Sequence, residues 1–121
     1  MIDFNVIFIN LKKIKKMDLS QEDWTLKLNE TENAIVLDVR TDGECSEGII
    51  PNAIQIDIYQ GQGFLDEVEV LDKTKTYFVY CRSGGRSAQA CAVMNQLGFE
   101  NAYNLMGGFT NWQGEVVEPE M

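Results

Sequence analysis

Apolar residues in this chain fall into short continuous runs. Residues 34–39 are almost entirely apolar and include several branched side chains, and residues 77–80 form a second run. Continuous apolar runs are typical of strands that are buried on both faces of a sheet. Shorter runs predict further strands over residues 53–58 and 102–105.

Between the predicted strands, apolar residues recur at helical spacing. Ser20 and the acidic residues after it mark one helix start. Two more helices are predicted from groups of apolar residues, namely Phe64, Val68 and Leu71, and then Ala90, Val93, Met94 and Leu97. Gly98 is suited to end the last helix. Strands that alternate with helices predict an α/β fold with a mostly parallel sheet covered on both faces.

The composition is that of one small acidic domain. The 121 residues are 45% hydrophobic, and the formal net charge is −9. This length can bury one core without disulfides or metal. The acidic balance argues against general nucleic-acid binding, which needs a basic surface. We divide the chain into an N-terminal extension (1–17), one domain (18–114) and an acidic tail (115–121), and we expect the tail to fray.

The N-terminal extension has an apolar segment and a basic run. Residues 6–9 are apolar, Asp3 precedes them, and lysines follow them at positions 12, 13, 15 and 16. A secretory signal has its positive charge first, so we interpret the apolar segment as a docked strand or short helix and the lysines as a solvated face. No segment approaches the roughly 20 apolar residues of a membrane span. We therefore expect a cytoplasmic protein without membrane contact.

Cysteine and histidine counts restrict the chemistry. Three cysteines without paired spacing do not form a disulfide framework, and free thiols suit a reducing cytoplasm. The chain has no histidine, which excludes Cys-His and Ser-His catalytic pairs and weakens every zinc hypothesis. We expect neither a metal nor an organic cofactor.

The strongest chemical signal is the loop that follows residues 77–80 and precedes a predicted helix. Its sequence is Cys81, Arg82, Ser83, Gly84, Gly85, Arg86 and Ser87. A strand, a loop and a helix in this order direct backbone N–H groups and the positive end of the helix dipole to one point. A thiol at that point ionises easily. Cys81 is therefore the candidate nucleophile, and its thiolate attacks without a base.

The other loop residues are suited to binding an anion. Gly84 and Gly85 allow a tight turn and a close approach of N–H groups to a ligand. Arg86 can hold an oxyanion through two hydrogen bonds. Arg82 either contacts the same anion or points to solvent and serves partner docking. Sulfur and phosphorus electrophiles both suit such a site.

A second group of candidate residues follows the strand at 34–39. Ligands of parallel sheets sit beyond the carboxyl ends of the strands, where both Cys81 and Arg40 are placed. Asp38 and Arg40 could be catalytic, but we favour a structural ion pair or a hydrogen bond that braces the loop. Glu44 could pair with Arg40 across one turn or simply be exposed.

Three motifs resemble those of the single-domain rhodaneses, which are thiosulfate sulfurtransferases. The loop that begins with Cys81 resembles their active-site loop. A first signature is similar to residues 37–40 with Glu44, Gly48 and residues 50–53, and a C-terminal one to residues 104–109 with Trp112. The matches occur in family order over roughly residues 18–114, which makes the signal specific. The resemblance implies a rhodanese-like α/β fold with a central five-stranded, mostly parallel sheet and helices on both faces.

The resemblance also implies a mechanism. The Cys81 thiolate would take the outer sulfur of a small anionic donor such as thiosulfate and pass it to a thiol, or experimentally to cyanide, through a persulfide. The backbone of residues 82–86, including Ser83, Gly84 and Gly85, would cradle the sulfur. Arg86 and Arg82 would hold the sulfonate. Asp38, Arg40 and Ser87 would have supporting roles. The implied acceptor is a cellular thiol, for example on a thioredoxin-like or sulfur-relay protein.

Three other functions stay open. Related phosphatases and arsenate reductases have five residues between cysteine and arginine, whereas this chain has four between Cys81 and Arg86. The shorter loop favours sulfur over phosphorus. A non-catalytic rhodanese module would only bind a partner, although the cysteine and both loop arginines are intact. A persulfide carrier that receives sulfur from a cysteine desulfurase would use the same thiolate.

The chain departs from the family pattern at Cys45 and Ile49, where an aromatic residue and a histidine are common. We expect the histidine to be structural in relatives. Cys45 has either a packing role at the rim of the site or a redox role. Cys91 is expected to fill the core, and Phe109 and Trp112 to pack in the core or in a lid.

Overall fold

A computed structural model gives the structure of the protein and describes residues 17–120. The expectations for the apolar segment and the lysines at 6–16 lie outside the described residues. Within them, no helix is both long enough and apolar enough to cross a membrane.

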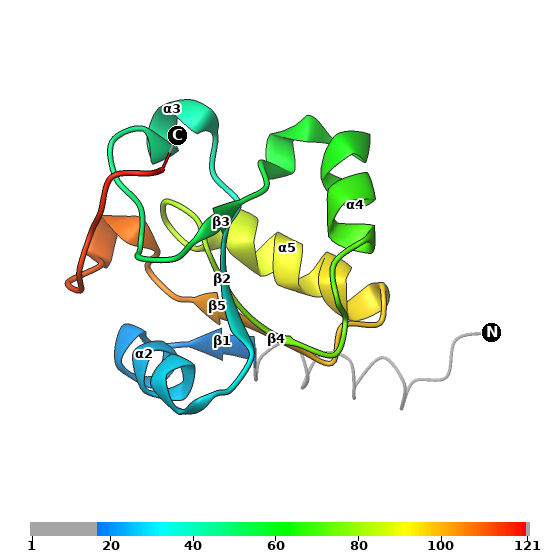
Figure 1. Ribbon diagram of the computed structural model, residues 1–121, viewed down its shortest axis with the longest axis horizontal. Coiled ribbons are helices and arrows are strands. Elements are labelled where there is room, and N and C mark those ends of the chain that lie inside the picture. The colour runs from blue at the N-terminus through cyan, green and yellow to red at the C-terminus, as the bar shows by residue number, and fades with distance from the viewer. Residues whose placement is uncertain (1–16, 121) are drawn as a thin grey trace.

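Five parallel strands form one sheet (Figure 1). Their order across the sheet is β1, β5, β4, β2, β3, and all pairings between these strands are parallel. Their bounds are Asp18–Leu19 for β1, Ala34–Asp38 for β2, Ile54–Gln55 for β3, Thr76–Tyr80 for β4 and Asn101–Leu105 for β5. The predicted α/β sheet is therefore confirmed.

Helices cover both faces of the sheet. The α-helices are α2 (Gln21–Glu30), α3 (Asp42–Cys45), α4 (Gln62–Glu69) and α5 (Gly85–Gln96), and the short 3₁₀ turns are η1 (Ile58–Gln60) and η2 (Phe109–Asn111). The Ser20 side chain caps α2 by accepting a hydrogen bond from the Asp23 amide, as the sequence predicts.

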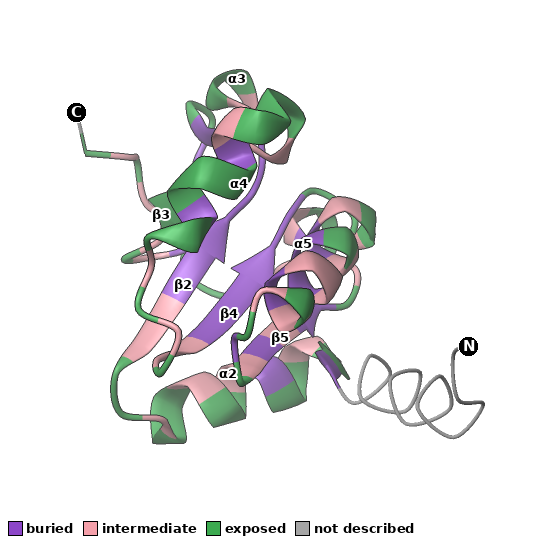
Figure 2. Ribbon diagram, turned by 90° about the vertical axis from the view of Figure 1, so that its right-hand side faces the viewer, coloured by how far each residue is buried: buried purple, intermediate pink, exposed green. Residues whose placement is uncertain are grey.

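Alternate residues of the central strands point to opposite faces of the sheet and pack into two separate hydrophobic cores. Tyr77 and Val79 of β4 pack with α4 and α5. Phe78 and Tyr80 pack on the opposite face with Trp24 of α2. Figure 2 shows the central strands buried along most of their length. This two-sided burial explains why the strand sequences are continuously apolar.

Three parts of the fold differ from the sequence-based expectation. The strand predicted over 53–58 is limited to Ile54–Gln55, and Asp57 already caps the 3₁₀ turn η1. The elements β1 and α3 were not predicted, since two and four residues are too few to show a periodicity. The expected fraying of the tail is wrong for Val117, which forms an antiparallel bridge with Ile49.

Candidate active site

The loops that follow β2, β4 and β5 meet at one edge of the sheet. Because these strands are parallel, their carboxyl ends lie at the same edge, and Asp38 is directly opposite Tyr80. Cys81 follows Tyr80 and is fully buried. The topology thus places Cys81 and Arg40 together, as the sequence predicts.

The Cys81 sulfur accepts hydrogen bonds within its own loop and helix. The Gly84 amide lies 3.1 Å from Sγ, and the Ser87 hydroxyl lies 3.3 Å from it. Burial by itself raises the pKa of the Cys81 thiol, but the hydrogen bonds from Ser87 and from backbone amides outweigh it, so the net pKa lies below that of an ordinary cysteine. The thiolate is therefore favoured without a neighbouring base.

Backbone geometry fixes the loop around this sulfur. Gly84 has φ = 104° and immediately precedes α5, which directs the positive end of the helix at Cys81. The Phe109 amide donates to the Cys81 carbonyl at 2.9 Å, and the Thr110 amide donates to the Arg82 carbonyl at 2.9 Å. A Cβ at Gly108 would lie 2.6 Å from the Arg82 carbonyl oxygen. The loop after β5 therefore braces the loop of Cys81.

A buried polar network extends behind Ser87. The Ser87 hydroxyl hydrogen-bonds to the Asn104 side-chain oxygen, and the Asn104 amide donates to Asp18 at 2.9 Å and to the Gly84 carbonyl at 3.3 Å. The two acceptors hold the Asn104 amide nitrogen away from Ser87. Sequence analysis places Asn104 in the C-terminal signature but gives it no role in the site, and it does not identify Asp18. A polar residue two positions after the buried Ala102 is the signal that could have assigned Asn104 to the site.

The predicted ion pair between Asp38 and Arg40 is present and buried. Two guanidinium nitrogens of Arg40 donate to Asp38 at 2.7–3.1 Å, and one also donates to the Gly48 carbonyl at 2.8 Å. The guanidinium lies 4.2 Å from the centre of the Phe109 ring. No contact joins either residue to the Cys81 sulfur, so the pair braces the loops.

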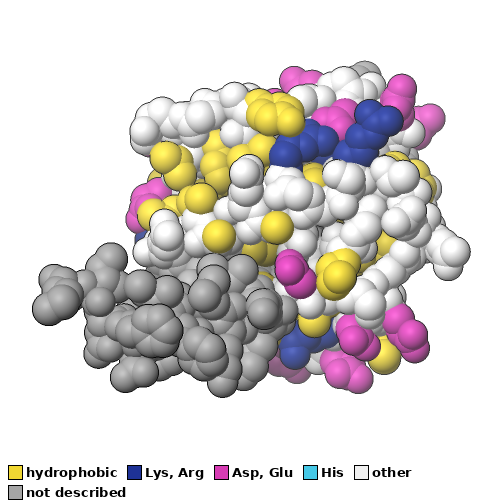
Figure 3. Space-filling model, turned by 180° about the vertical axis from the view of Figure 1, so that it is seen from behind, with side chains coloured by type: hydrophobic (Ala, Val, Ile, Leu, Met, Phe, Trp, Pro, Cys, Tyr) yellow, Lys and Arg dark blue, Asp and Glu magenta, His cyan; other side chains and the backbone are white. Residues whose placement is uncertain are grey.

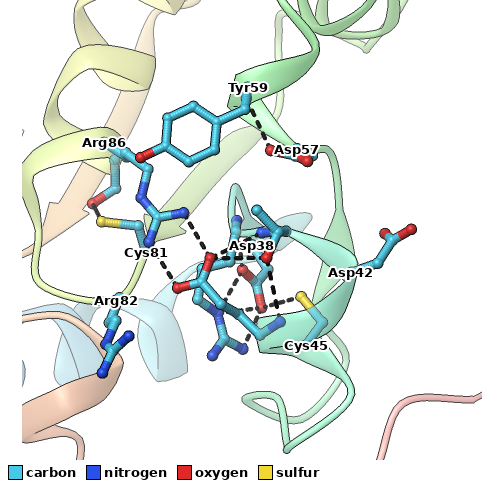
Figure 4. Close-up of polar contacts among 12 residues, drawn as sticks. Asp38, Asp42, Cys45, Asp57, Tyr59, Cys81, Arg82 and Arg86 are labelled. Atoms are coloured by element: carbon cyan, nitrogen blue, oxygen red, sulfur yellow. Dashed lines mark hydrogen bonds and ion pairs between the residues drawn. The ribbon is translucent and has the colours of Figure 1, made fainter.

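Glu44 pairs with Arg86, so both alternatives for it, a pairing with Arg40 and simple exposure, are wrong. Both terminal nitrogens of Arg86 donate to the carboxylate, each at 2.8 Å. The hydrogen bonds from Arg86 lower the pKa of Glu44 to about 2. Tyr59 covers the guanidinium, with 5.1 Å between the Arg86 Cζ and the ring centre. Figure 4 shows Arg86 flanked by Tyr59 and Cys81.

The remaining predicted site residues are more exposed. Arg82 is exposed, and Figure 4 shows its side chain extending away from the Cys81 sulfur. Ser83 and Gly85 are also exposed. Among the described residues on the face seen in Figure 3, Lys and Arg side chains form no continuous basic surface. The predicted roles of Arg82 and Arg86 toward a bound anion stay predictions.

The two other cysteines are buried and protonated. Cys45 is buried and donates to Asp38 at 3.3 Å, which fits the packing role of the two roles considered for it. Burial, together with the nearby Asp38 charge, raises the pKa of its thiol to about 12. Burial also raises the pKa of Cys91, which packs in the core as expected. Within residues 17–120, no three side chains are grouped to hold a metal ion.

Comparisons with known proteins agree on one family. The model of the rhodanese-like domain matches residues 21–115. A sulfurtransferase of Allochromatium vinosum is 34% identical over 106 residues, which are 85% of this chain and 96% of that protein. A tRNA uridine(34) hydroxylase of Legionella pneumophila is 35% identical over 84% of this chain but only 41% of its own length.

The solved structures show the same fold. A crystal structure of a rhodanese-like domain protein from Staphylococcus aureus superposes with a TM-score of 0.72 at 29% identity. The match covers 85% of this chain and 98% of that one.

Proposed function

Because the chain belongs to the rhodanese-like family, we propose that it is a sulfurtransferase that carries sulfane sulfur as a persulfide on Cys81. Sulfur transfer in general is supported by the match to a sulfurtransferase over nearly its whole length. The observation that carries the proposal is the Cys81 sulfur itself. It is buried at the N-terminus of α5 and accepts hydrogen bonds from Gly84 and Ser87.

The reaction has two displacement steps. The Cys81 thiolate attacks the outer sulfur of the donor, the donor's S–S bond breaks, and its electron pair leaves with the donor, as sulfite when thiosulfate is used. An acceptor thiolate then attacks the outer sulfur of the Cys81 persulfide, and the Cys81 thiolate leaves. Gly84 and Ser87 stabilise this thiolate as nucleophile and as leaving group. Neither step needs a histidine.

The proposed partners are a small sulfane-sulfur donor and a protein thiol, such as that of a thioredoxin-like or sulfur-relay protein. The exposed Arg82 suits contact with either one. We assign Arg82 and Arg86 to this contact and the Ser83, Gly84 and Gly85 backbone to the sulfur. A carrier that only relays persulfide would use the same groups. We place the reaction in the cytoplasm, where free thiols persist.

The test is intact mass spectrometry after incubation with a sulfur donor. Wild type should gain about 32 Da, the mass of one sulfur, from thiosulfate or an alkyl persulfide, and cyanide should remove it as thiocyanate. Cys81→Ser should gain nothing, whereas Cys91→Ser, the matched control at a buried thiol, should load normally. If wild type gains no mass from either donor, the transfer function is wrong and the non-catalytic binding module is the remaining interpretation. Release of phosphate from an aryl phosphate would instead favour a phosphatase.

A further inference from the structure

The charge of Arg86 is already neutralised in the structure. Its two terminal nitrogens form parallel hydrogen bonds of 2.8 Å to the two carboxylate oxygens of Glu44. The side chains are only 16% and 22% exposed, so solvent screens the pair weakly. Two parallel hydrogen bonds between one guanidinium and one carboxylate are the strongest form of an arginine–carboxylate ion pair. A sulfonate therefore reaches Arg86 only by displacing Glu44 or by lying beside its negative charge.

Glu44 is held in place from its own side as well. Thr41 donates to the same carboxylate through its amide and its hydroxyl, each at 3.1 Å, in the capping box of α3. Displacing Glu44 from Arg86 would thus leave a partly buried carboxylate with Thr41 as its remaining partner. With its pKa lowered to about 2, Glu44 is charged at neutral pH.

Few positive charges remain for a dianion. The chain has three arginines. Arg40 is paired with Asp38 and Arg86 with Glu44, so that among residues 17–120 Arg82 is the only arginine without an ion pair. Thiosulfate brings two negative charges to a site that already contains a thiolate and the Glu44 carboxylate. An alkyl persulfide brings at most one, since its sulfane sulfur is bound to a thiol sulfur in place of a sulfonate, and it brings none in the protonated form that the Cys81 thiolate attacks.

We propose that Glu44 is a specificity-determining residue that disfavours thiosulfate and selects persulfide donors. This inference rests on the proposed transfer through Cys81. The selected reaction is balanced: the Cys81 thiolate bonds to the outer sulfur of R–S–SH, the donor S–S bond breaks, and R–S⁻ leaves with the electron pair. The hydrogen stays on the transferred sulfur, and one negative charge is present before and after.

The experiment compares the loading rate of Cys81 from thiosulfate with that from 2-hydroxyethyl persulfide by intact mass in a single turnover. Even when it is ionised, this persulfide carries one negative charge fewer than thiosulfate. Wild type should load faster from the persulfide at equal concentration. Glu44→Gln keeps an oxygen for Thr41 and Arg86 but removes the charge. It should accelerate loading from thiosulfate by about tenfold or more, because juxtaposed like charges are strongly unfavourable. Loading from the persulfide should change by less than about threefold.

Glu47→Gln is the matched control, because it removes the same charge from an exposed residue that lies three positions after Glu44. It should change neither rate. A Glu44→Gln variant that slows both donors equally would make Glu44 only a brace for Arg86 and would overturn the proposal. A wild-type preference for thiosulfate would overturn it without any variant. If wild type loads from neither donor, the transfer function itself fails.

Discussion

At Cys81, burial and hydrogen bonding act on the thiol in opposite directions. Burial disfavours the thiolate, and donors from Ser87 and the backbone of residues 83–87 favour it. Among these donors Ser87 is the only side chain, and its single hydroxyl hydrogen lies within reach of two acceptors, the Cys81 sulfur and the Asn104 side-chain oxygen. The Ser87 hydroxyl is thus shared between the sulfur and Asn104. It is the side chain whose removal should change the pKa of Cys81 most.

Removing this hydroxyl should make Cys81 less acidic. In wild type, the rate of alkylation by iodoacetamide should rise with pH and level off at a pH below that of an ordinary cysteine, since the pKa is lowered. Ser87→Ala should move the curve to higher pH and slow alkylation at pH 7 by about fivefold, because one hydrogen bond contributes about 1 kcal/mol.

Ser83→Ala is the control for this experiment, because the Ser83 side chain is exposed and its backbone amide is retained. Its curve should coincide with that of wild type. Cys45 and Cys91 should stay unmodified in the folded protein, since burial raises the pKa of both thiols. An unchanged curve for Ser87→Ala would assign the acidity of Cys81 to the backbone amides alone.

At the scale of elements, the site depends on connections between the loops that follow the strands. The Asp38–Arg40 pair joins the end of β2 to Gly48 and contacts the Phe109 ring after β5. Both side chains are almost completely buried. A buried pair of this kind costs much more to break than it contributes as a whole.

Asp38→Asn should therefore destabilise the fold strongly. It leaves the buried Arg40 guanidinium without a counter-charge, for which a loss of about 3–5 kcal/mol in the free energy of unfolding is expected. Urea denaturation measures this loss. Asp66→Asn removes the same charge from an exposed position on α4 and should change stability by less than about 0.5 kcal/mol. Equal stabilities of the two variants would contradict the bracing role.

At the scale of the whole molecule, sequence patterns predicted the elements that form within one short stretch of chain, but not the contacts between distant stretches. The strand at β4, the helix at α5 and the loop between them follow from continuous apolar residues, helical spacing and glycines. Spacing suggested Arg40 as the partner of Glu44, but the sheet brings Arg86 to it from 42 residues away. Likewise β1 exists only because β5 offers it a neighbour. Such contacts depend on the assembled sheet and leave no periodic signal in the sequence.

The tail is the clearest case, because its acidic composition predicted fraying. Instead, Val117 and Ile49 exchange two backbone hydrogen bonds of 2.8 and 2.9 Å. Val116 packs so closely on Gly48 that a Cβ there would lie 2.7 Å from its Cγ1. The tail thus closes over the segment whose Gly48 carbonyl accepts from Arg40.

Deletion of residues 116–121 should lower the free energy of unfolding by about 1–3 kcal/mol, from two hydrogen bonds and one apolar contact. Urea denaturation measures the loss, and hydrogen exchange at the Ile49 amide reports the bridge directly. The alkylation curve of Cys81 should not move, because its donors lie within residues 83–87. A full-length variant with Glu118→Gln and Glu120→Gln removes the same charges but keeps the bridge, so it should retain wild-type stability and slow Ile49 exchange. If the Ile49 amide exchanges equally fast in the deletion variant and in wild type, the bridge to Val117 is absent and the fraying predicted from composition is correct.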